Sequence, residues 1–324
     1  MCTSRPFARC GRACGKARLG APGWVGENSD LFDHPALLSR GVPQECLMMS
    51  SMLRDTLHEE RATGLYWVVI PSYNEAATVR EVAARARRQC PNVIVVDDGS
   101  VDGTVQALAG LDVTVLRNDE NRGKAGSLMR GFDHALAHGA VGVMTLDADG
   151  QHSPEEIPLF LEQTVQYPAA FIIGIRRQDQ RQTSFWRYTA NRIADFWIGW
   201  AAGMPIEDSQ SGFRLYPARL LRTVRVPHGR QESFVYESEI LIEAARQGVA
   251  LKQVIVSVTP RSGPSPSHFR PLTDIAGIIR MVAWKLVSRG LYPRGLYRIC
   301  FKRTESARPA HQYHRQELPE HIHK

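Results

Sequence analysis

The residues best suited to chemistry lie in short polar clusters that directly follow an apolar run or precede a predicted helix. Asp147 and Asp149 form a D-x-D pair after residues 141–146. Two carboxylates at this spacing can bind one hard divalent ion, because Mg²⁺ and Mn²⁺ favour oxygen ligands and are often completed by substrate phosphates. Such an ion would neutralise a diphosphate and assist its departure. A solvated acidic turn that bends at Gly150 is the alternative interpretation.

A second acidic pair, Asp97 and Asp98, follows the apolar segment 92–96. Adjacent acids beside a buried strand are costly unless they are paired or face solvent. One of them could accept hydrogen bonds from a base or a ribose. The alternative is that this cluster only begins a helix, with Ser100 or Asp102 as the N-cap residue.

A third cluster has the sequence Asn-Arg-Gly-Lys, residues 121–124, and stands just before a predicted helix. Backbone N–H groups and cations at such a position can meet an anion. The spacing is not that of the phosphate-binding loop of nucleotide hydrolases, and the chain contains no G-x-G-x-x-G segment. These patterns argue against a nucleotide hydrolase of that type and against a dinucleotide-dependent oxidoreductase.

Strands and helices alternate along the segment that carries these clusters. Short apolar runs predict strands over residues 65–70, 92–96, 113–116, 141–146, 170–175 and 251–258. Amphipathic periodicity predicts helices over residues 78–90, 102–109, 124–138, 155–167, 186–202, 233–247 and 273–289. This alternation is typical of an α/β fold with a mostly parallel central sheet flanked by helices. Since ligands bind beyond the carboxyl ends of parallel strands, the polar segments 71–75, 97–100 and 147–152, which follow the runs 65–70, 92–96 and 141–146, should converge on one edge of the sheet.

The rest of the chain divides around a single domain. Residues 1–62 are rich in Gly, Pro, Cys and charge without a sustained period, which predicts a poorly ordered extension. The catalytic domain is expected over 63–260, followed by a basic amphipathic segment over 261–303. The polar, His-rich tail from 304 to 324 is expected to be disordered.

Charge and aromatic residues indicate which partners the protein has. The net charge is +7, and the stretch 270–303 alone carries eight basic residues against one acid. Such a balance suits an anionic membrane or phosphorylated substrates, whereas no module for reading or stacking nucleic acid is evident. Aromatic and basic residues interleave in 185–200 and 280–303, as in segments that rest on headgroups. A core-packed helix with a solvated basic face is the alternative.

Membrane-spanning and secretory signals are not evident. No apolar run reaches transmembrane length, and the N-terminus has no apolar signal core. The six cysteines follow no zinc-site or disulfide pattern. We therefore expect a cytoplasmic protein that can lie peripherally on the inner face of a membrane.

Taken together, the motifs resemble the family 2 inverting glycosyltransferases of the GT-A fold. The segments VVIPSYNE, VVDDGSVDGT, NRGKAGSL, DADGQH and DSQSGFR occur in the family's order and at its usual separations, over roughly residues 65–258. The DADxQHxPE pattern is typical of the dolichol- and polyprenyl-phosphate hexosyltransferase branch. The resemblance rests on five motifs and is therefore far more specific than any single one.

The resemblance implies a role for each matching residue. The metal, Mg²⁺ or Mn²⁺, would be bound by Asp147, Asp149 and Gln151. The nucleotide-sugar donor, a GDP- or UDP-sugar, would contact Pro71, Tyr73, Glu75, Asp97, Asp98, Lys124 and Asp147. The residues expected to act in catalysis are Asp149, Arg214, which contacts phosphate in that branch, and Asp208. Ser211 would shape the same loop. The segment FVYESEI resembles an F-x-x-E pattern that places Glu237 and Glu239 near the acceptor, although they could equally form the polar face of an ordinary helix.

The implied reaction is transfer of a hexose to a lipid-linked acceptor, with inversion. A lipid phosphate is already anionic and needs no general base, whereas a hydroxyl acceptor would need one. Asp208 is the first candidate for that base and His152 the second, with a structural loop histidine as the alternative for His152. The branch usually carries R-x-x-G-x-S-K after the last strand, but here Arg261 and Gly263 are followed by no such Lys, which puts the exact acceptor in doubt. The alternatives are transfer to a hydroxyl of a glycolipid, polysaccharide or lipid-like metabolite, and a non-catalytic module that binds nucleotide sugar or lipid.

Overall fold

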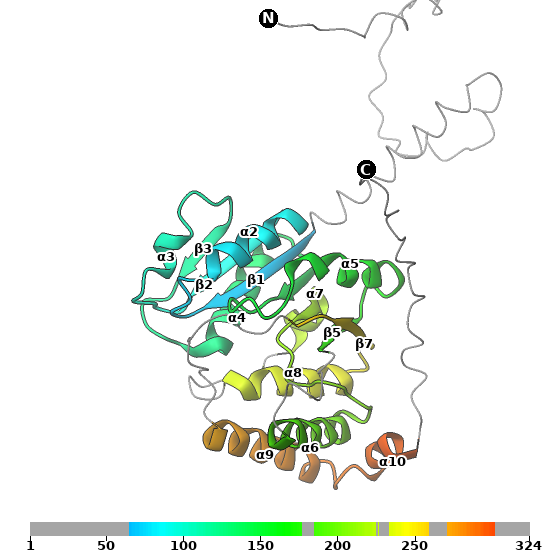
Figure 1. Ribbon diagram of the computed structural model, residues 1–324. Coiled ribbons are helices and arrows are strands. Elements are labelled where there is room, and N and C mark those ends of the chain that lie inside the picture. Colours follow the sequence, from blue (N-terminus) through cyan, green and yellow to red (C-terminus); the bar gives the residue numbers. More distant parts are fainter. Residues whose placement is uncertain (1–64, 177–184, 225, 227–232, 259–270, 302–324) are drawn as a thin grey trace, which may run out of the picture. The chain divides into compact units, whose positions relative to one another are not determined.

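The computed structural model describes residues 65–176, 185–224, 226, 233–258 and 271–301 (Figure 1). All of them belong to one compact unit that spans residues 56–324. The predicted extension over 1–62 and the tail over 304–324 lie outside the described residues. The expected boundary between the catalytic domain and the basic segment, near residue 260, lies outside them as well. These divisions therefore stay predictions.

A seven-stranded sheet forms the centre of the unit (Figure 1). Its strands are β1 (Tyr66–Ser72), β2 (Val93–Asp97), β3 (Thr114–Arg117), β4 (Gly142–Thr145), β5 (Phe171–Arg176), β6 (Arg214–Pro217) and β7 (Leu251–Val256). The strand order is β3-β2-β1-β4-β6-β5-β7. All neighbouring strands pair in parallel except β6, which runs antiparallel to both β4 and β5. The predicted, mostly parallel sheet is confirmed, but β6 was not predicted from the sequence.

Helices connect most of these strands (Figure 1). They are α2 (Val79–Gln89), α3 (Thr104–Ala107), α4 (Gly123–Ala137), α5 (Ile157–Gln166), α6 (Phe185–Ala202), α7 (Ala218–Thr223), α8 (Ser233–Arg246), α9 (Pro271–Val287) and α10 (Pro293–Phe301). The predicted helix 155–167 begins instead with a 3₁₀ turn, η1 (Pro154–Glu156). The predicted helix 102–109 shortens to α3, because Gly103 takes a left-handed φ of 89° immediately before it.

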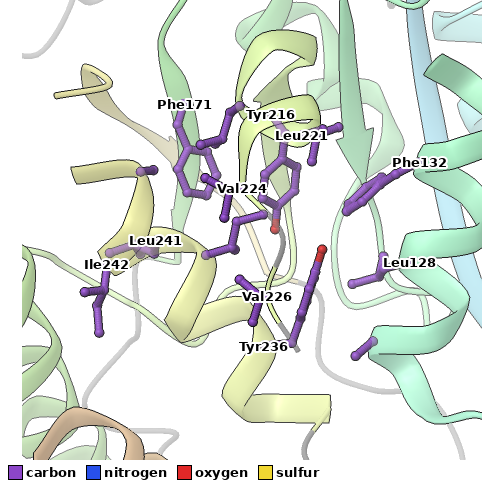
Figure 2. Packing of buried hydrophobic residues seen from close by; sticks show 14 of the residues in the cluster. Leu128, Phe132, Phe171, Tyr216, Leu221, Val224, Val226, Tyr236, Leu241 and Ile242 are labelled. Carbon is purple, nitrogen blue, oxygen red and sulfur yellow. The ribbon is translucent and has the colours of Figure 1, made fainter. Parts of the chain in front are cut away.

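Two apolar layers cover the two faces of the sheet. Successive strand residues point to opposite faces, so Val68 and Ile70 pack with α2 and α5, whereas Val69 packs with α4. Burial on both sides explains why these strands are continuous apolar runs rather than alternating ones. In the layer that contains Val69 and α4, the ring centroids of Phe132 in α4 and Tyr216 in β6 lie 5.2 Å apart (Figure 2). This layer continues into α8 and fixes that helix beside the sheet.

Helix α8 lies between the sheet side of the unit and the outer helices α6 and α9. It contacts α4 on the side of the sheet and α6 and α9 on the other side (Figure 1). Helix α10 packs on α6, where the indole N–H of Trp200 donates to the carbonyl of Tyr292 at 3.2 Å. Within the described part of the chain, no helix is both long and apolar enough to span a bilayer.

Candidate active site

The three strands that carry polar clusters are neighbours in the sheet. Strand β1 lies between β2 and β4 and is parallel to both, so the clusters meet at one edge as predicted. The chain order reverses between β1 and β4, since β2 and β3 extend to one side of β1 and the later strands to the other. Such a switch point is where ligands bind in open parallel sheets.

The loops after β1 and β2 are bound to each other. The backbone N–H of Asn74 donates to the Ser100 hydroxyl at 2.8 Å, and that of Glu75 donates to the Thr104 hydroxyl at 3.0 Å. Asp102 accepts a hydrogen bond from the backbone N–H of Thr104 at 3.1 Å. Thus Ser100 supports the neighbouring loop rather than capping α3. These bonds fix the segment of Pro71, Tyr73 and Glu75, whose predicted contacts with the nucleotide stay predictions.

Asp98 uses its carboxylate inside the protein. The side chain is buried and accepts hydrogen bonds from the amide of Asn118 at 2.7 Å and from the backbone N–H groups of Arg122 and Gly123, both at 2.8 Å. The anion that meets the start of α4 is therefore Asp98 itself, where the sequence suggested a bound ligand. Asp98 orders the Asn-Arg-Gly-Lys loop from which Lys124 projects.

Asp97 is buried beside it and makes weaker contacts. One carboxylate oxygen accepts from the backbone N–H of Ser100 at 3.3 Å, and the other lies 3.4 Å from Nε of Arg117. No described residue donates a hydrogen bond to Oδ2 of Asp97. The protein thus supplies more hydrogen-bond donors to the carboxylate of Asp98 than to that of Asp97.

Asp147 contacts a lysine from the neighbouring loop. Nζ of Lys124 lies 2.7 Å from Oδ1 of Asp147 and 3.3 Å from Oε2 of Glu237, which α8 supplies. Burial alone would raise the pKa of Asp147, but Lys124 chiefly, with His152 and Arg176, holds that pKa below its ordinary value. Burial would likewise lower the pKa of Lys124, but the two carboxylates raise it. Asp147 and Lys124 are therefore both charged at neutral pH.

A glycine makes room for Asp147. A Cβ on Gly212 would lie 2.9 Å from both Cγ and Oδ1 of Asp147, which is closer than such atoms approach. The carbonyl of Gly212 accepts a hydrogen bond from the Thr145 hydroxyl at 2.7 Å, which ties the loop before β6 to β4. The glycine of the SGFR segment is thus required for the position of the first D-x-D carboxylate.

The rest of the D-x-D loop turns back on itself. Asp149 accepts a hydrogen bond from the backbone N–H of Gln151 at 3.0 Å. His152 is buried, pairs with Val258 in an isolated bridge and packs on Phe213. Burial lowers the pKa of His152 to about 4, so its imidazole is neutral at physiological pH. Its burial and ring packing agree with a structural loop histidine, the alternative to a general base.

The donor set fits a hard divalent cation that substrate completes. Asp147 and Asp149 offer carboxylates, and Gln151 offers an amide oxygen, at the strand end where a diphosphate would bind. Among the described residues, no group of three or more His, Cys, Asp or Glu side chains is placed to hold a metal ion.

Arg214 is placed differently from its predicted phosphate contact. The side chain is completely buried, and its guanidinium donates to the carbonyls of Ser211 at 2.7 Å and of Ser209 and Glu237, both at 2.6 Å. These bonds join the loop before β6 to α8. In this arrangement Arg214 positions the site from within the core and faces no open space.

Asp208 is bound by an arginine that the sequence analysis missed. Nε and a terminal nitrogen of Arg176 donate to the two oxygens of Asp208 at 2.7 and 2.6 Å, and the backbone N–H of Arg176 donates at 3.0 Å. Asp195 of α6 in turn accepts from the backbone N–H of Ser209 at 2.8 Å. Because Arg176 directly follows an apolar run that is parallel to β4, its position at the same sheet edge was a signal available from the sequence. Glu239, which the sequence analysis placed near the acceptor, forms an ion pair with Lys285 of α9 at 2.8 Å.

The comparisons with known proteins agree with this geometry. Residues 67–224 match the sequence model described as "Glycosyl transferase family 2". The "polyprenol monophosphomannose synthase" of Mycolicibacterium smegmatis is 28% identical over 253 residues, which cover 74% of this chain and 93% of the relative. The "undecaprenyl-phosphate mannosyltransferase" of Micrococcus luteus is 29% identical over 233 residues, which cover 68% and 94%.

Solved structures show the same fold. Mannosyl-3-phosphoglycerate synthase from Rubrobacter xylanophilus aligns with a TM-score of 0.57 at 19% identity and covers 72% of this chain and 77% of its own. Glucosyl-3-phosphoglycerate synthase from Mycobacterium tuberculosis, in complex with Mg²⁺ and uridine diphosphate, aligns with a TM-score of 0.52 at 20% identity and covers 72% and 82%. The likeness shows that the described part of the chain has the GT-A fold that its motifs predicted. The match over residues 67–224 and the curated relatives bear out the resemblance to family 2 glycosyltransferases that the motifs predicted.

Proposed function

We propose that this protein is a metal-dependent inverting glycosyltransferase that moves a hexose from a nucleotide-sugar donor to a polyprenyl phosphate-like lipid acceptor. The observation that carries the proposal is the position of Asp147 at the switch point of the sheet, with a charged lysine beside it. The substrate class comes from the names of two curated relatives, a polyprenol monophosphomannose synthase and an undecaprenyl-phosphate mannosyltransferase.

The residues of the strand-end loops divide the work between them. Asp147, Asp149 and Gln151 would bind Mg²⁺ or Mn²⁺, and a bound ion supplies positive charge to the departing nucleoside diphosphate. Lys124 adds a cation at the same place and can orient a phosphate oxygen. Tyr73 and the neighbouring residues of the β1 loop would hold the nucleotide, with the donor held for displacement at the anomeric carbon.

The contacts of Asp208 support a phosphate acceptor. A general base must be free to take a proton, but both oxygens of Asp208 are engaged by the guanidinium of Arg176. The other candidate, His152, is buried and packs on Phe213. An acceptor that is already an anion removes the need for either group. Arg176 stands where it could also meet such an anion.

The surface formed by α6, α9 and α10 supports a membrane-proximal acceptor. Large apolar side chains are exposed there, among them Trp197, Ile279, Trp284 at 69% exposure, Val287, Leu291, Tyr297 and Phe301. The exposed apolar rings argue against the alternative of a purely core-packed helix with a solvated basic face. With Arg289, Arg294 and Arg298 on the same segments, they suit the headgroup layer of an anionic membrane. Lys285, in contrast, is paired with Glu239 and Glu243 and belongs to the fold.

The proposal is tested by transfer assays on purified protein. GDP- and UDP-hexoses are offered with polyprenyl phosphate, with the corresponding free polyprenol and with a glycolipid, and products are detected by mass. We expect product from polyprenyl phosphate that is lost in chelator and returns with Mn²⁺. Product only from a hydroxyl acceptor would establish the alternative transferase. Binding of donor without turnover on any acceptor would favour the non-catalytic module.

The metal residues are tested in the same assay. Asp149→Ala should abolish turnover while leaving the melting temperature within a few degrees. The matched control is Asp112→Ala, because Asp112 is an exposed acid just before β3, at the opposite edge of the sheet. Full activity of Asp149→Ala, or of the wild type in excess chelator, would overturn the metal assignment.

A further inference from the structure

Lys124 stands between two carboxylates that come from different parts of the fold. It is the second residue of α4, and its ammonium reaches Asp147 after β4 at 2.7 Å and Glu237 on α8 at 3.3 Å. The shorter distance shows that Asp147 is its principal partner. Asp147 is also the residue that a divalent cation would need.

Glu237 is an unusual second partner because it is not fully satisfied. The residue is 5% exposed, and no described residue donates a hydrogen bond to its Oε1. Its backbone is fixed, since the carbonyl of Glu237 accepts from Arg214 at 2.6 Å and the adjacent Tyr236 packs in the core (Figure 2). A buried carboxylate oxygen without a hydrogen-bond donor is costly, so contact with a nearby cation stabilises it.

Asp147 itself has little freedom to move away from Lys124. The backbone at Gly212 lies close to the carboxylate, and Lys124 forms an ion pair with it. A cation that binds Asp147 must therefore compete with the ammonium of Lys124. Lys124 can leave Asp147 and still have an anionic partner, because its Nζ already lies 3.3 Å from Oε2 of Glu237.

We infer that Lys124 is an internal counter-ion of the metal site, which occupies Asp147 in the metal-free protein and transfers to Glu237 when a divalent cation binds. This inference rests on the proposed function, since it concerns the same Asp147. It assigns Glu237 as a positioning residue that receives Lys124. The ion pair keeps the carboxylate satisfied between turnovers and makes binding of the bare cation weak. A donor diphosphate favours the exchange, because it offers the released ammonium a second anion.

The two side chains should therefore affect the affinity for bare metal in opposite directions. Lys124→Gln removes the competitor and leaves Asp147 and the buried Glu237 without their shared cation, so Mn²⁺ alone should bind about tenfold more tightly. Glu237→Gln removes the alternative partner and leaves Lys124 on Asp147, so Mn²⁺ alone should bind about tenfold more weakly. A role in packing alone predicts a loss of affinity for both variants.

The experiment titrates full-length protein with Mn²⁺ and follows free Mn²⁺ by electron paramagnetic resonance, with and without uridine or guanosine diphosphate. Glu243→Gln is the matched control, since it removes the same charge from the same helix but breaks only the pairs with Lys285 and Arg246. Its affinity should stay within about twofold of the wild type. Added nucleoside diphosphate should increase Mn²⁺ affinity more in the wild type than in Lys124→Gln.

The outcomes separate this inference from the proposed function. Mn²⁺ binding to the wild type with equal or weaker binding to Lys124→Gln would overturn the inference and leave the metal site standing. Failure of every variant to bind Mn²⁺, even with nucleoside diphosphate, would overturn both. If Lys124→Gln folds poorly, the double variant with Glu237→Gln restores the charge balance. That variant must still bind bare Mn²⁺ more tightly than the wild type, and failure to do so would also overturn the inference.

Discussion

Replacing Arg214 by Met tests whether this arginine acts on a ligand or on the fold. The substitution keeps most of the side-chain volume but removes the donors to the carbonyls of Ser209, Ser211 and Glu237. A buried acceptor that loses its partner costs about 1–3 kcal/mol. Each carbonyl oxygen has a second lone pair, and removing a buried charge recovers some desolvation energy, so we take the lower end for each. The free energy of unfolding should then fall by about 3 kcal/mol.

The assay is urea denaturation followed by tryptophan fluorescence, combined with calorimetric binding of nucleoside diphosphate to the folded variant. Arg80→Met is the matched control, because Arg80 also donates to backbone carbonyls, those of Ala107 and Ala109, but does so at the surface. It should cost less than about 1 kcal/mol. If Arg214→Met unfolds like the wild type and only weakens diphosphate binding, Arg214 contacts phosphate directly and our structural argument is wrong.

Three further predictions follow from other parts of the site. Gly212→Ala should displace Asp147 and lower kcat/KM by about 100-fold. The control, Gly277→Ala in α9, should leave kcat/KM unchanged, because the new methyl meets only a valine side chain. Wild-type turnover of Gly212→Ala would contradict the close approach of residue 212 to the Asp147 carboxylate. His152 has a pKa lowered to about 4, so it binds a proton more readily when unfolded, and stability should fall as pH drops from about 6.5 towards 4. His152→Gln should flatten that pH dependence of the melting temperature, and an unchanged profile would show that other groups cause it. Replacing Arg294 and Arg298 by Gln should weaken sedimentation with anionic vesicles by about 1 kcal/mol each, and equal binding to neutral vesicles would argue against a membrane surface.

The strands that position the site were predictable because burial on both faces leaves a strong signal. The runs that became β1, β2 and β4 are uninterrupted and apolar, and each ends in acids or turn residues. Strand β6 has no such signal, because it is four residues long, begins with a charged residue and passes directly into α7. Its antiparallel direction depends on pairing with β4 and β5, which no local pattern encodes.

The candidate residues were predictable as a group, but their individual contacts were not. A charged side chain after a strand looks the same in the sequence whether it faces a ligand or the protein. Asp98 turned out to face the N–H groups that begin α4. Likewise, the pairing of Lys124 with Glu237 depends on how α8 packs against α4, a contact set by apolar side chains such as Phe132 and Tyr236. Long-range packing of this kind decides which charges meet.

The loop before β6 positions several charged side chains of the candidate site at once. Gly212 leaves space for Asp147, and Arg214 binds the carbonyl of Glu237 and so fixes the helix that faces Lys124. At its other end, Asp208 holds Arg176 at the end of β5. The two acids that contact Lys124 are therefore both located by this loop, and a shift in it would move them together. It follows that substitutions in the loop should alter metal affinity and stability jointly, whereas substitutions in the β1 loop should alter nucleotide binding alone.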